Sequence, residues 1–197
     1  MKTEIEAKFL DVNHEDLRRK LRELGAAMEQ PMRLMRRAII DDGKGVMQRR
    51  DAYVRVRDEG DKITLTYKQF DALSVDGAKE IEVTVSDYEA TIQIFEVVGF
   101  KVLSRQESRR ETWRLDEVEI VLDEWPWLKP YIEIEGDSEV ELQNAAKRLG
   151  FDWQNAVFGD VMAAYRAEYP HLTITDSVVS LPEVSFDGPL PGLLQYK

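Results

Sequence analysis

The chain has 197 residues and carries 27 Lys and Arg against 38 Asp and Glu, a net charge of −11. Hydrophobic residues make up 43% of it, which supports a packed core and excludes wholesale disorder. The acidic balance argues against a general binder of nucleic acids or anionic membranes. Cysteine is absent, which excludes disulfides, thiolate metal sites and cysteine nucleophiles, and the two histidines are too few for a multi-histidine metal cage.

The N-terminal residues are charged and contain no apolar signal-peptide core. No stretch approaches the roughly 18 apolar residues that span a membrane. We therefore expect a cytoplasmic protein that binds neither membranes nor nucleic acid.

Alternation of charged and apolar side chains predicts strands in the first half of the chain. The first strand covers residues 3–10, where Glu4, Glu6 and Lys8 share one face. Asn13 then caps a helix that ends near Gly25. Further strands are expected over 32–42, 52–58, 62–70 and 79–86, and the turn at 59–61 joins two of them as a hairpin.

A helix over 87–98 separates these strands from the second half of the chain. Two or three strands follow within 101–123, and another covers 129–135. A capping box at 138–141 starts a helix that ends at Gly150, and a short helix is expected over 160–168. We expect a domain over 1–168 and a C-terminal extension over 169–197, partly extended or flexible, where four prolines interrupt the pattern.

These elements predict an α+β fold with about eight strands in antiparallel hairpins. Closure of such a sheet into a β-barrel, with the helices packed outside, would remove its edges.

Like charges recur two residues apart on the strand faces: acidic pairs occur in three strands, and Arg55 and Arg57 form a basic pair. One interpretation is a solvated polar face, as on any half-buried sheet. The mutual repulsion of these like charges favours a second interpretation, a binding site. A divalent cation would compensate the negative charge of the carboxylates, and a polyphosphate would compensate the positive charge of the arginines. The pattern therefore predicts a concave site in which carboxylates hold Mg²⁺ or Mn²⁺ and basic side chains hold phosphates.

The segment Glu4-Ile5-Glu6-Ala7-Lys8 resembles the ExExK signature of the CYTH domain, the triphosphate tunnel metalloenzymes. Other segments that resemble the family follow in its order, at 54–57, 65–68, 79–82, 110–113, 121–124 and 131–135. The resemblance covers residues 1 to about 168. It implies an eight-stranded antiparallel barrel that encloses a triphosphate tunnel. Family members include inorganic, thiamine and RNA triphosphatases and class IV adenylyl cyclases.

The resemblance also implies roles for the charged side chains. The metal ligands, for Mg²⁺ or Mn²⁺, would be Glu4, Glu6, Glu82, Asp123, Glu133 and Glu135. The triphosphate would be bound by Lys8, Arg55, Arg57, Lys68 and Arg110. Catalysis is expected from Glu4, Glu6, Lys8 and Lys68. The implied partner is a small-molecule triphosphate, and the protein would be a monomer or a homodimer.

The chain departs from the family at one basic position. Members often carry Lys-x-Arg where this chain has Ser108-x-Arg110. One phosphate-binding cation is therefore missing unless another arginine substitutes, the candidates being Arg37, Arg109 and Arg114. Arg33 and Arg37 share strand parity and could face the tunnel, but we favour a solvated face for both.

Three functions remain open. The first is a metal-dependent hydrolase of tripolyphosphate, thiamine triphosphate or a nucleoside triphosphate. The alternatives are a class IV-like adenylyl cyclase that forms cyclic AMP and pyrophosphate, and a non-catalytic polyphosphate- or nucleotide-binding module. We favour the hydrolase because it needs no nucleobase pocket, and no motif in the sequence predicts one. Positioning and charge neutralisation would supply most of the catalysis.

Overall fold

The computed structural model describes residues 1–195, apart from the side chain of Gln48. The strands are β1 (Lys2–Phe9), β2 (Ala27–Asp41), β3 (Ala52–Asp58), β4 (Ile63–Phe70), β5 (Ala78–Val85), β6 (Lys101–Leu115), β7 (Val118–Glu124), β8 (Tyr131–Gly136) and β9 (Glu183–Val184). The helices are α1 (His14–Glu23), α2 (Val46–Arg49), α3 (Tyr88–Val97), α4 (Glu139–Leu149) and α5 (Val161–Glu168), with short 3₁₀ turns η1 (Trp153–Asn155), η2 (Val178–Ser180) and η3 (Gly192–Leu194). Each predicted helix and strand has a counterpart, while α2, β9 and the 3₁₀ turns were not expected.

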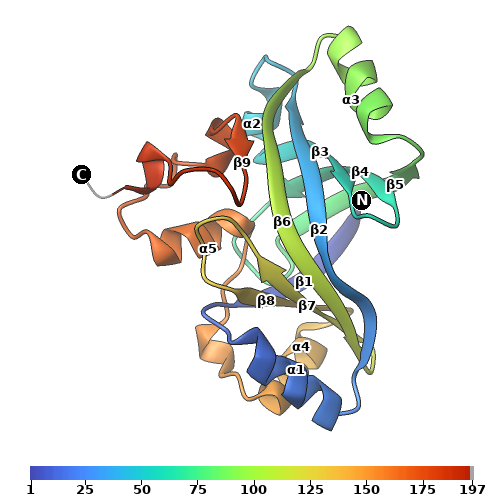
Figure 1. Ribbon diagram of the computed structural model, residues 1–197, viewed down its shortest axis with the longest axis vertical. Helices are drawn as coiled ribbons and strands as arrows, with labels where there is room; N and C mark the ends of the chain where they lie inside the picture. The colour runs from blue at the N-terminus through green and yellow to red at the C-terminus, as the bar shows by residue number, and fades with distance from the viewer. Residues whose placement is uncertain (196–197) are drawn as a thin grey trace.

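Strands β1 to β8 form a closed antiparallel barrel. Their order is β2-β3-β4-β5-β1-β8-β7-β6, and β6 pairs back onto β2. The two long strands β2 and β6 run side by side along one face of the molecule (Figure 1). The predicted eight-stranded barrel is therefore confirmed. Strand β9 pairs in parallel with Arg105 and Gln106 of β6, beyond the part of β6 that pairs with β7.

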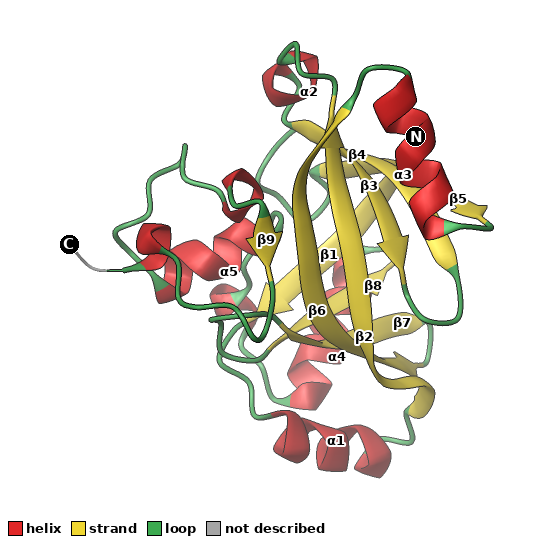
Figure 2. Ribbon diagram, turned by 45° about the horizontal axis from the view of Figure 1, so that its top comes forward, coloured by secondary structure: helices red, strands yellow, loops and turns green. Residues whose placement is uncertain are grey.

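Successive side chains of a strand point to opposite faces, and in this barrel the apolar ones point outward. The largest core lies between the barrel wall and the helices α1 and α4, which Figure 2 shows at one end of the barrel. It joins Ala7 of β1 and Ile134 of β8 to Leu21 of α1 and Leu142 of α4, all fully buried. Burying one such leucine stabilises the fold by roughly 1.5–3 kcal/mol. The helices thus cover the wall from outside and leave its inner face to polar side chains.

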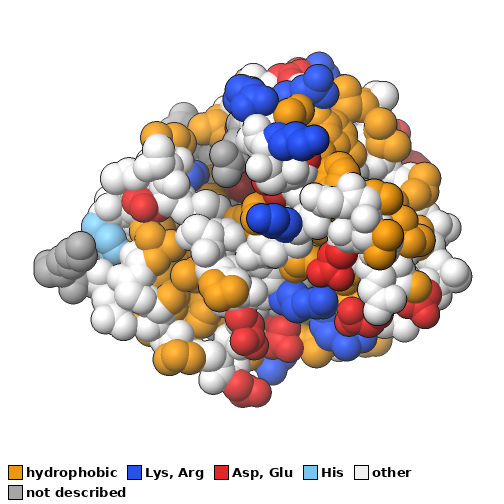
Figure 3. Space-filling view, turned by 90° about the horizontal axis from the view of Figure 1, so that it is seen from above, with side chains coloured by type: hydrophobic (Ala, Val, Ile, Leu, Met, Phe, Trp, Pro, Cys, Tyr) orange, Lys and Arg blue, Asp and Glu red, His pale blue; other side chains and the backbone are white. Residues whose placement is uncertain are grey.

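A second core packs α3 against the outer faces of β2 and β3. It includes Ile40, Val56 and Ile92, each almost fully buried. The opposite side of α3 and the turn after it expose Ile94, Val97 and Val98. Figure 3 shows apolar side chains in several places on one face of the molecule, interspersed with side chains of both charges. The choice between monomer and homodimer stays a prediction.

The third core joins the end of the barrel to α5 and the C-terminal segment. Trp125, which directly follows β7, packs there with Tyr131 of β8, Tyr165, Val178 and Val184. Residues 169–195 therefore lie against the barrel, beside α5 (Figure 2). The division at residue 168 stays a prediction, and 196–197 lie outside the described residues. No helix within 1–195 is long and apolar enough to cross a membrane.

Candidate active site

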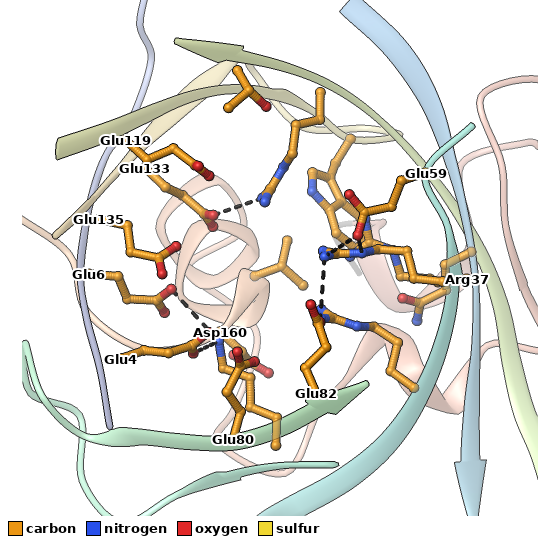
Figure 4. A pocket seen from close by; sticks show the side chains of 18 of the residues that line it. Glu4, Glu6, Arg37, Glu59, Glu80, Glu82, Glu119, Glu133, Glu135 and Asp160 are labelled. Carbon is orange, nitrogen blue, oxygen red and sulfur yellow. Dashed lines mark hydrogen bonds and ion pairs between the residues drawn. The ribbon is translucent and has the colours of Figure 1, made fainter. Parts of the chain in front are cut away.

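The barrel encloses a cavity of about 510 Å³ whose walls are charged (Figure 4). Inward-facing side chains from all eight barrel strands line it, and Asp160, Val161 and Val179 line it from the C-terminal part of the chain. The strand alternation places there almost every candidate named above: Glu4, Glu6, Lys8, Arg55, Arg57, Lys68, Glu82, Arg110, Glu133 and Glu135. The volume is that of a small-molecule site.

One wall of the cavity is acidic because strand register aligns glutamates from three neighbouring strands. Glu6 of β1 pairs with Glu135 of β8, which pairs with Glu119 of β7. Figure 4 shows this wall continuing to Glu4 and Glu133. Burial, and then the charges of Glu4, Glu6 and Glu119, raise the pKa of Glu135 to about 7. Among the described residues the side chain of Glu135 takes part in no ion pair or hydrogen bond.

Two lysines stand among the other carboxylates of this wall. Lys8 Nζ lies 3.1 Å from Glu6 Oε1 and 3.3 Å from Glu133 Oε1. Lys68 forms an ion pair with Glu4, and its Nζ lies 3.7 Å from Glu6 Oε2. Burial opposes the charge on Lys8, but Glu133 and Glu6 keep its pKa above the usual value. The two ammonium groups therefore neutralise part of the acidic wall.

The facing wall is basic. Arg37 of β2 and Arg57 of β3 are direct cross-strand partners, and Arg55 lies two residues before Arg57 on the same face of β3. Arg57 Nη2 lies 2.7 Å from Glu59 Oε1, and Arg55 Nη2 lies 3.7 Å from Glu82 Oε2. Burial, and then Arg55, lower the pKa of Arg57 to about 10. Like charges are thus held together with only partial compensation.

Arg110 connects the two walls. Its Nε donates to Asp123 Oδ1 at 2.7 Å, and its Nη2 donates to Asp123 Oδ2 at 2.5 Å and Glu133 Oε2 at 2.8 Å. Asp123 is fully buried behind Arg110 and does not line the cavity. Glu82 lines it on the basic side, where it accepts a hydrogen bond from Thr66 at 2.7 Å. The metal-binding role of Asp123 and of Glu82 stays a prediction.

The expectation of a solvated face for Arg33 and Arg37 is wrong, because both side chains line the cavity. Arg37 is only 6% exposed, and its Nη2 donates to Ser108 Oγ at 2.5 Å. Arg109 and Arg114 do not line the cavity: Arg109 forms an ion pair with Glu124, and Arg114 forms ion pairs with the lining residues Glu29 and Glu119. Of the three candidates to replace a cation at position 108, the structure brings Arg37 to the cavity.

Sequence reasoning missed several lining side chains, among them Glu59, Glu80 and Glu119. Glu80 belongs to a recognised acidic pair, and burial together with its hydrogen bond to Glu4 raises its pKa to about 7. Glu119 shares strand parity with Asp123, a signal that could have identified it. Glu59 follows β3 in the turn, where alternation gives no direction.

The acidic wall fits a divalent cation in the chemistry of its donors. Mg²⁺ and Mn²⁺ prefer carboxylate oxygens, and the raised pKa of Glu135 reports negative charge without a compensating cation. Within residues 1–195 no three acidic or histidine side chains already converge as a metal cage. Lys8 and Lys68 occupy the space between the carboxylates instead.

Fold and site together define a closed antiparallel barrel whose interior opposes an acidic and a basic wall. The chain belongs to the CYTH domain family, whose model matches residues 2–154. A protein of Methanocaldococcus jannaschii named "Putative adenylate cyclase MJ0240" is 33% identical over 87 residues. That match covers 43% of this chain and 49% of the relative, so the chain matches only about half of that protein's length.

Solved structures share the fold. The PH1012 protein of Pyrococcus horikoshii is 27% identical, with 78% of this chain and 93% of that chain covered and a TM-score of 0.64. HpAC1 of Hippeastrum, described as an adenylyl cyclase candidate with a dominant triphosphatase activity, is 17% identical with a TM-score of 0.56. Its comparison covers 84% of this chain and 96% of that one. At this identity the likeness to HpAC1 supports the fold alone.

Proposed function

We propose that the protein hydrolyses a small triphosphate with the help of a divalent cation. The observation that carries the proposal is the pair of facing walls within one cavity. Four arginines, the buried Arg37 and Arg55 and the largely buried Arg57 and Arg110, line the same cavity as the glutamates of β1, β7 and β8. A triphosphate carries about four negative charges, and basic groups held in a low-dielectric interior bind it without reorganising.

The two lysines would exchange partners when a ligand arrives. Lys8 and Lys68 now neutralise Glu4, Glu6 and Glu133, and they face the same cavity as the arginines. Phosphate oxygens would draw both ammonium groups away, because a charge-assisted hydrogen bond to phosphate is strong. The carboxylates so released, with Glu135, would hold Mg²⁺ or Mn²⁺. The bound cation would neutralise charge on the phosphate oxygens.

Hydrolysis follows from this arrangement by in-line attack. A water oxygen forms a bond to the terminal phosphorus while the bridging P–O bond breaks and the water releases a proton. The products are orthophosphate and the shortened phosphate chain. Arg55, Arg57 and Arg110 stabilise charge on the reacting group, and positioning supplies most of the rate because little covalent assistance is needed.

A second candidate is adenylyl cyclase activity, which the name of the Methanocaldococcus relative suggests. It needs a surface for the nucleobase. Of the aromatic side chains that line the cavity, Tyr131 is buried and Trp125 lies under the Arg37 guanidinium. Tyr53 and Phe70, whose ring centroids lie 6.4 Å apart, are the remaining aromatic surface among the described lining residues. We favour hydrolysis, which needs no such surface.

The test is product analysis by ³¹P NMR with tripolyphosphate, thiamine triphosphate and ATP, each with Mg²⁺ and then Mn²⁺. Orthophosphate release that stops on chelation supports the proposal. Pyrophosphate together with cyclic AMP would replace it with the cyclase. Binding without turnover would leave a non-catalytic module. Glu6→Gln should abolish turnover, while the exposed Glu96→Gln serves as the matched control.

A further inference from the structure

Arg37 is a buried cation without a counter-ion. Among the described residues the other four cavity arginines pair with carboxylates: Arg33 and Arg57 with Glu59, Arg55 with Glu82 and Arg110 with Asp123. No ion pair of Arg37 exists within residues 1–195, and its Nε, although buried, has no hydrogen-bond partner. Arg37 is 94% buried, and its side chain lines the cavity.

The neighbours of Arg37 orient its guanidinium but do not neutralise it. The guanidinium carbon lies 4.4 Å from the centroid of the Trp125 ring, and Nη2 donates to Ser108 Oγ at 2.5 Å. Both are neutral partners. Burial, followed by the charges of Arg55, Arg57 and Arg110, lowers the pKa of Arg37 to about 9. Such a group destabilises the ligand-free protein, because a buried charge needs an opposite one.

The C-terminal segment holds this arrangement in place. The indole of Trp125 belongs to the core that contains Val178, Val184 and Leu194. Val184 pairs with Gln106 of β6, and Gln106 pairs with Arg37 of β2, so the three residues form one row across the sheet. The family match ends at residue 154, before this segment begins. Residues beyond the family domain therefore support the surface on which Arg37 stacks.

We propose that Arg37 is a phosphate-binding residue, pre-oriented by Trp125 and Ser108 to bind the phosphate chain. The proposal rests on the proposed function for the identity of the anion. An anion there would supply the missing opposite charge and a partner for the free Nε. The planar guanidinium, with several donors in a fixed fork, suits phosphate oxygens.

The test measures tripolyphosphate binding by calorimetry and the melting temperature of the ligand-free protein in the same variants. Arg37→Met should weaken binding roughly 10- to 100-fold, as expected for loss of charge-assisted hydrogen bonds. Its ligand-free melting temperature should stay level or rise, because the uncompensated charge is gone. A purely structural role would lower the melting temperature and leave affinity unchanged. Arg36→Met is the matched control, since Arg36 is the exposed neighbour paired with Asp58.

A second experiment moves the positive charge from position 37 to position 108. Ser108→Lys places an ammonium where the Arg37 guanidinium now donates its hydrogen bond, so Arg37→Met with Ser108→Lys should recover most of the lost affinity. Arg37→Gln replaces Arg37→Met if the latter does not fold. A dissociation constant within about threefold of wild type in the Arg37 variant would overturn the proposal. Tripolyphosphate binding without hydrolysis in the wild type would overturn only the hydrolase, whereas absence of binding would overturn both.

Discussion

Replacing Arg110 by methionine should destabilise the protein by about 3–5 kcal/mol, the usual cost of breaking a buried ion pair by removing one partner. Asp123 has no exposed surface, and both of its oxygens accept hydrogen bonds from Arg110, at 2.7 and 2.5 Å. Methionine fills much of the arginine volume but leaves the carboxylate buried and unpaired. The expected loss of stability therefore comes from the unpaired, buried carboxylate of Asp123 more than from lost packing.

For a chain of this size a loss of 1 kcal/mol lowers the melting temperature by about 2–4 °C, so Arg110→Met should melt roughly 6–20 °C below wild type. Circular dichroism melts at pH 7 measure this directly. Adding Asp123→Asn to Arg110→Met removes the stranded charge and should recover a substantial part of the loss. A single variant within about 1 kcal/mol of wild type, or a double variant no more stable than the single one, would refute the reasoning.

Three further predictions concern the cavity. Glu6→Gln should abolish metal-dependent phosphate release while the melting temperature stays near wild type; normal turnover would remove Glu6 from the metal site. Arg57→Ala should weaken tripolyphosphate binding by ~1.5–3 kcal/mol in calorimetry, and unchanged affinity would exclude contact with the ligand. Burial opposes the charge of Glu59, but the positive charges of Arg57 and Lys62 lower its pKa below 4.5. The ionised Glu59 therefore stabilises the folded protein above pH 4.5, and this stabilisation is lost as the pH falls through the lower pKa of the folded state. Chemical denaturation from about pH 6 to 3 should show a shallower stability loss in Glu59→Gln than in wild type, and equal slopes would contradict this.

Most of the fold could be predicted because charge alternates with apolar residues along the strands. In β1 the alternation of Glu4, Glu6 and Lys8 with Ile5 and Ala7 already separates the two faces of the wall. Period-two patterns survive wherever one face is covered by helices. The two-residue strand β9 left no such pattern, because its place depends on pairing with β6, far away in sequence.

The site was predicted less completely than the fold, and β2 shows why. Arg36 and Arg37 are adjacent, so alternation cannot tell which of them faces inward. Register shifts along the pairing of β2 with β6 break the parity count from either end of the strand. The contact between Arg37 and Ser108 joins residues 71 positions apart and depends on that register. Local pattern carries no such information.

The hydrogen-bonded ring also determines which dimension of a ligand can vary. Every strand from β1 to β8 is paired on both sides, so widening the barrel would require breaking a ladder of backbone hydrogen bonds. Girth is therefore fixed, while length along the barrel axis is not constrained by the ring. An unbranched chain of tetrahedral groups short enough for the cavity of about 510 Å³ suits this constraint better than a branched or bulky anion of equal charge. The ring of strands thus limits the cross-section of a ligand, in addition to the charged side chains that line the cavity.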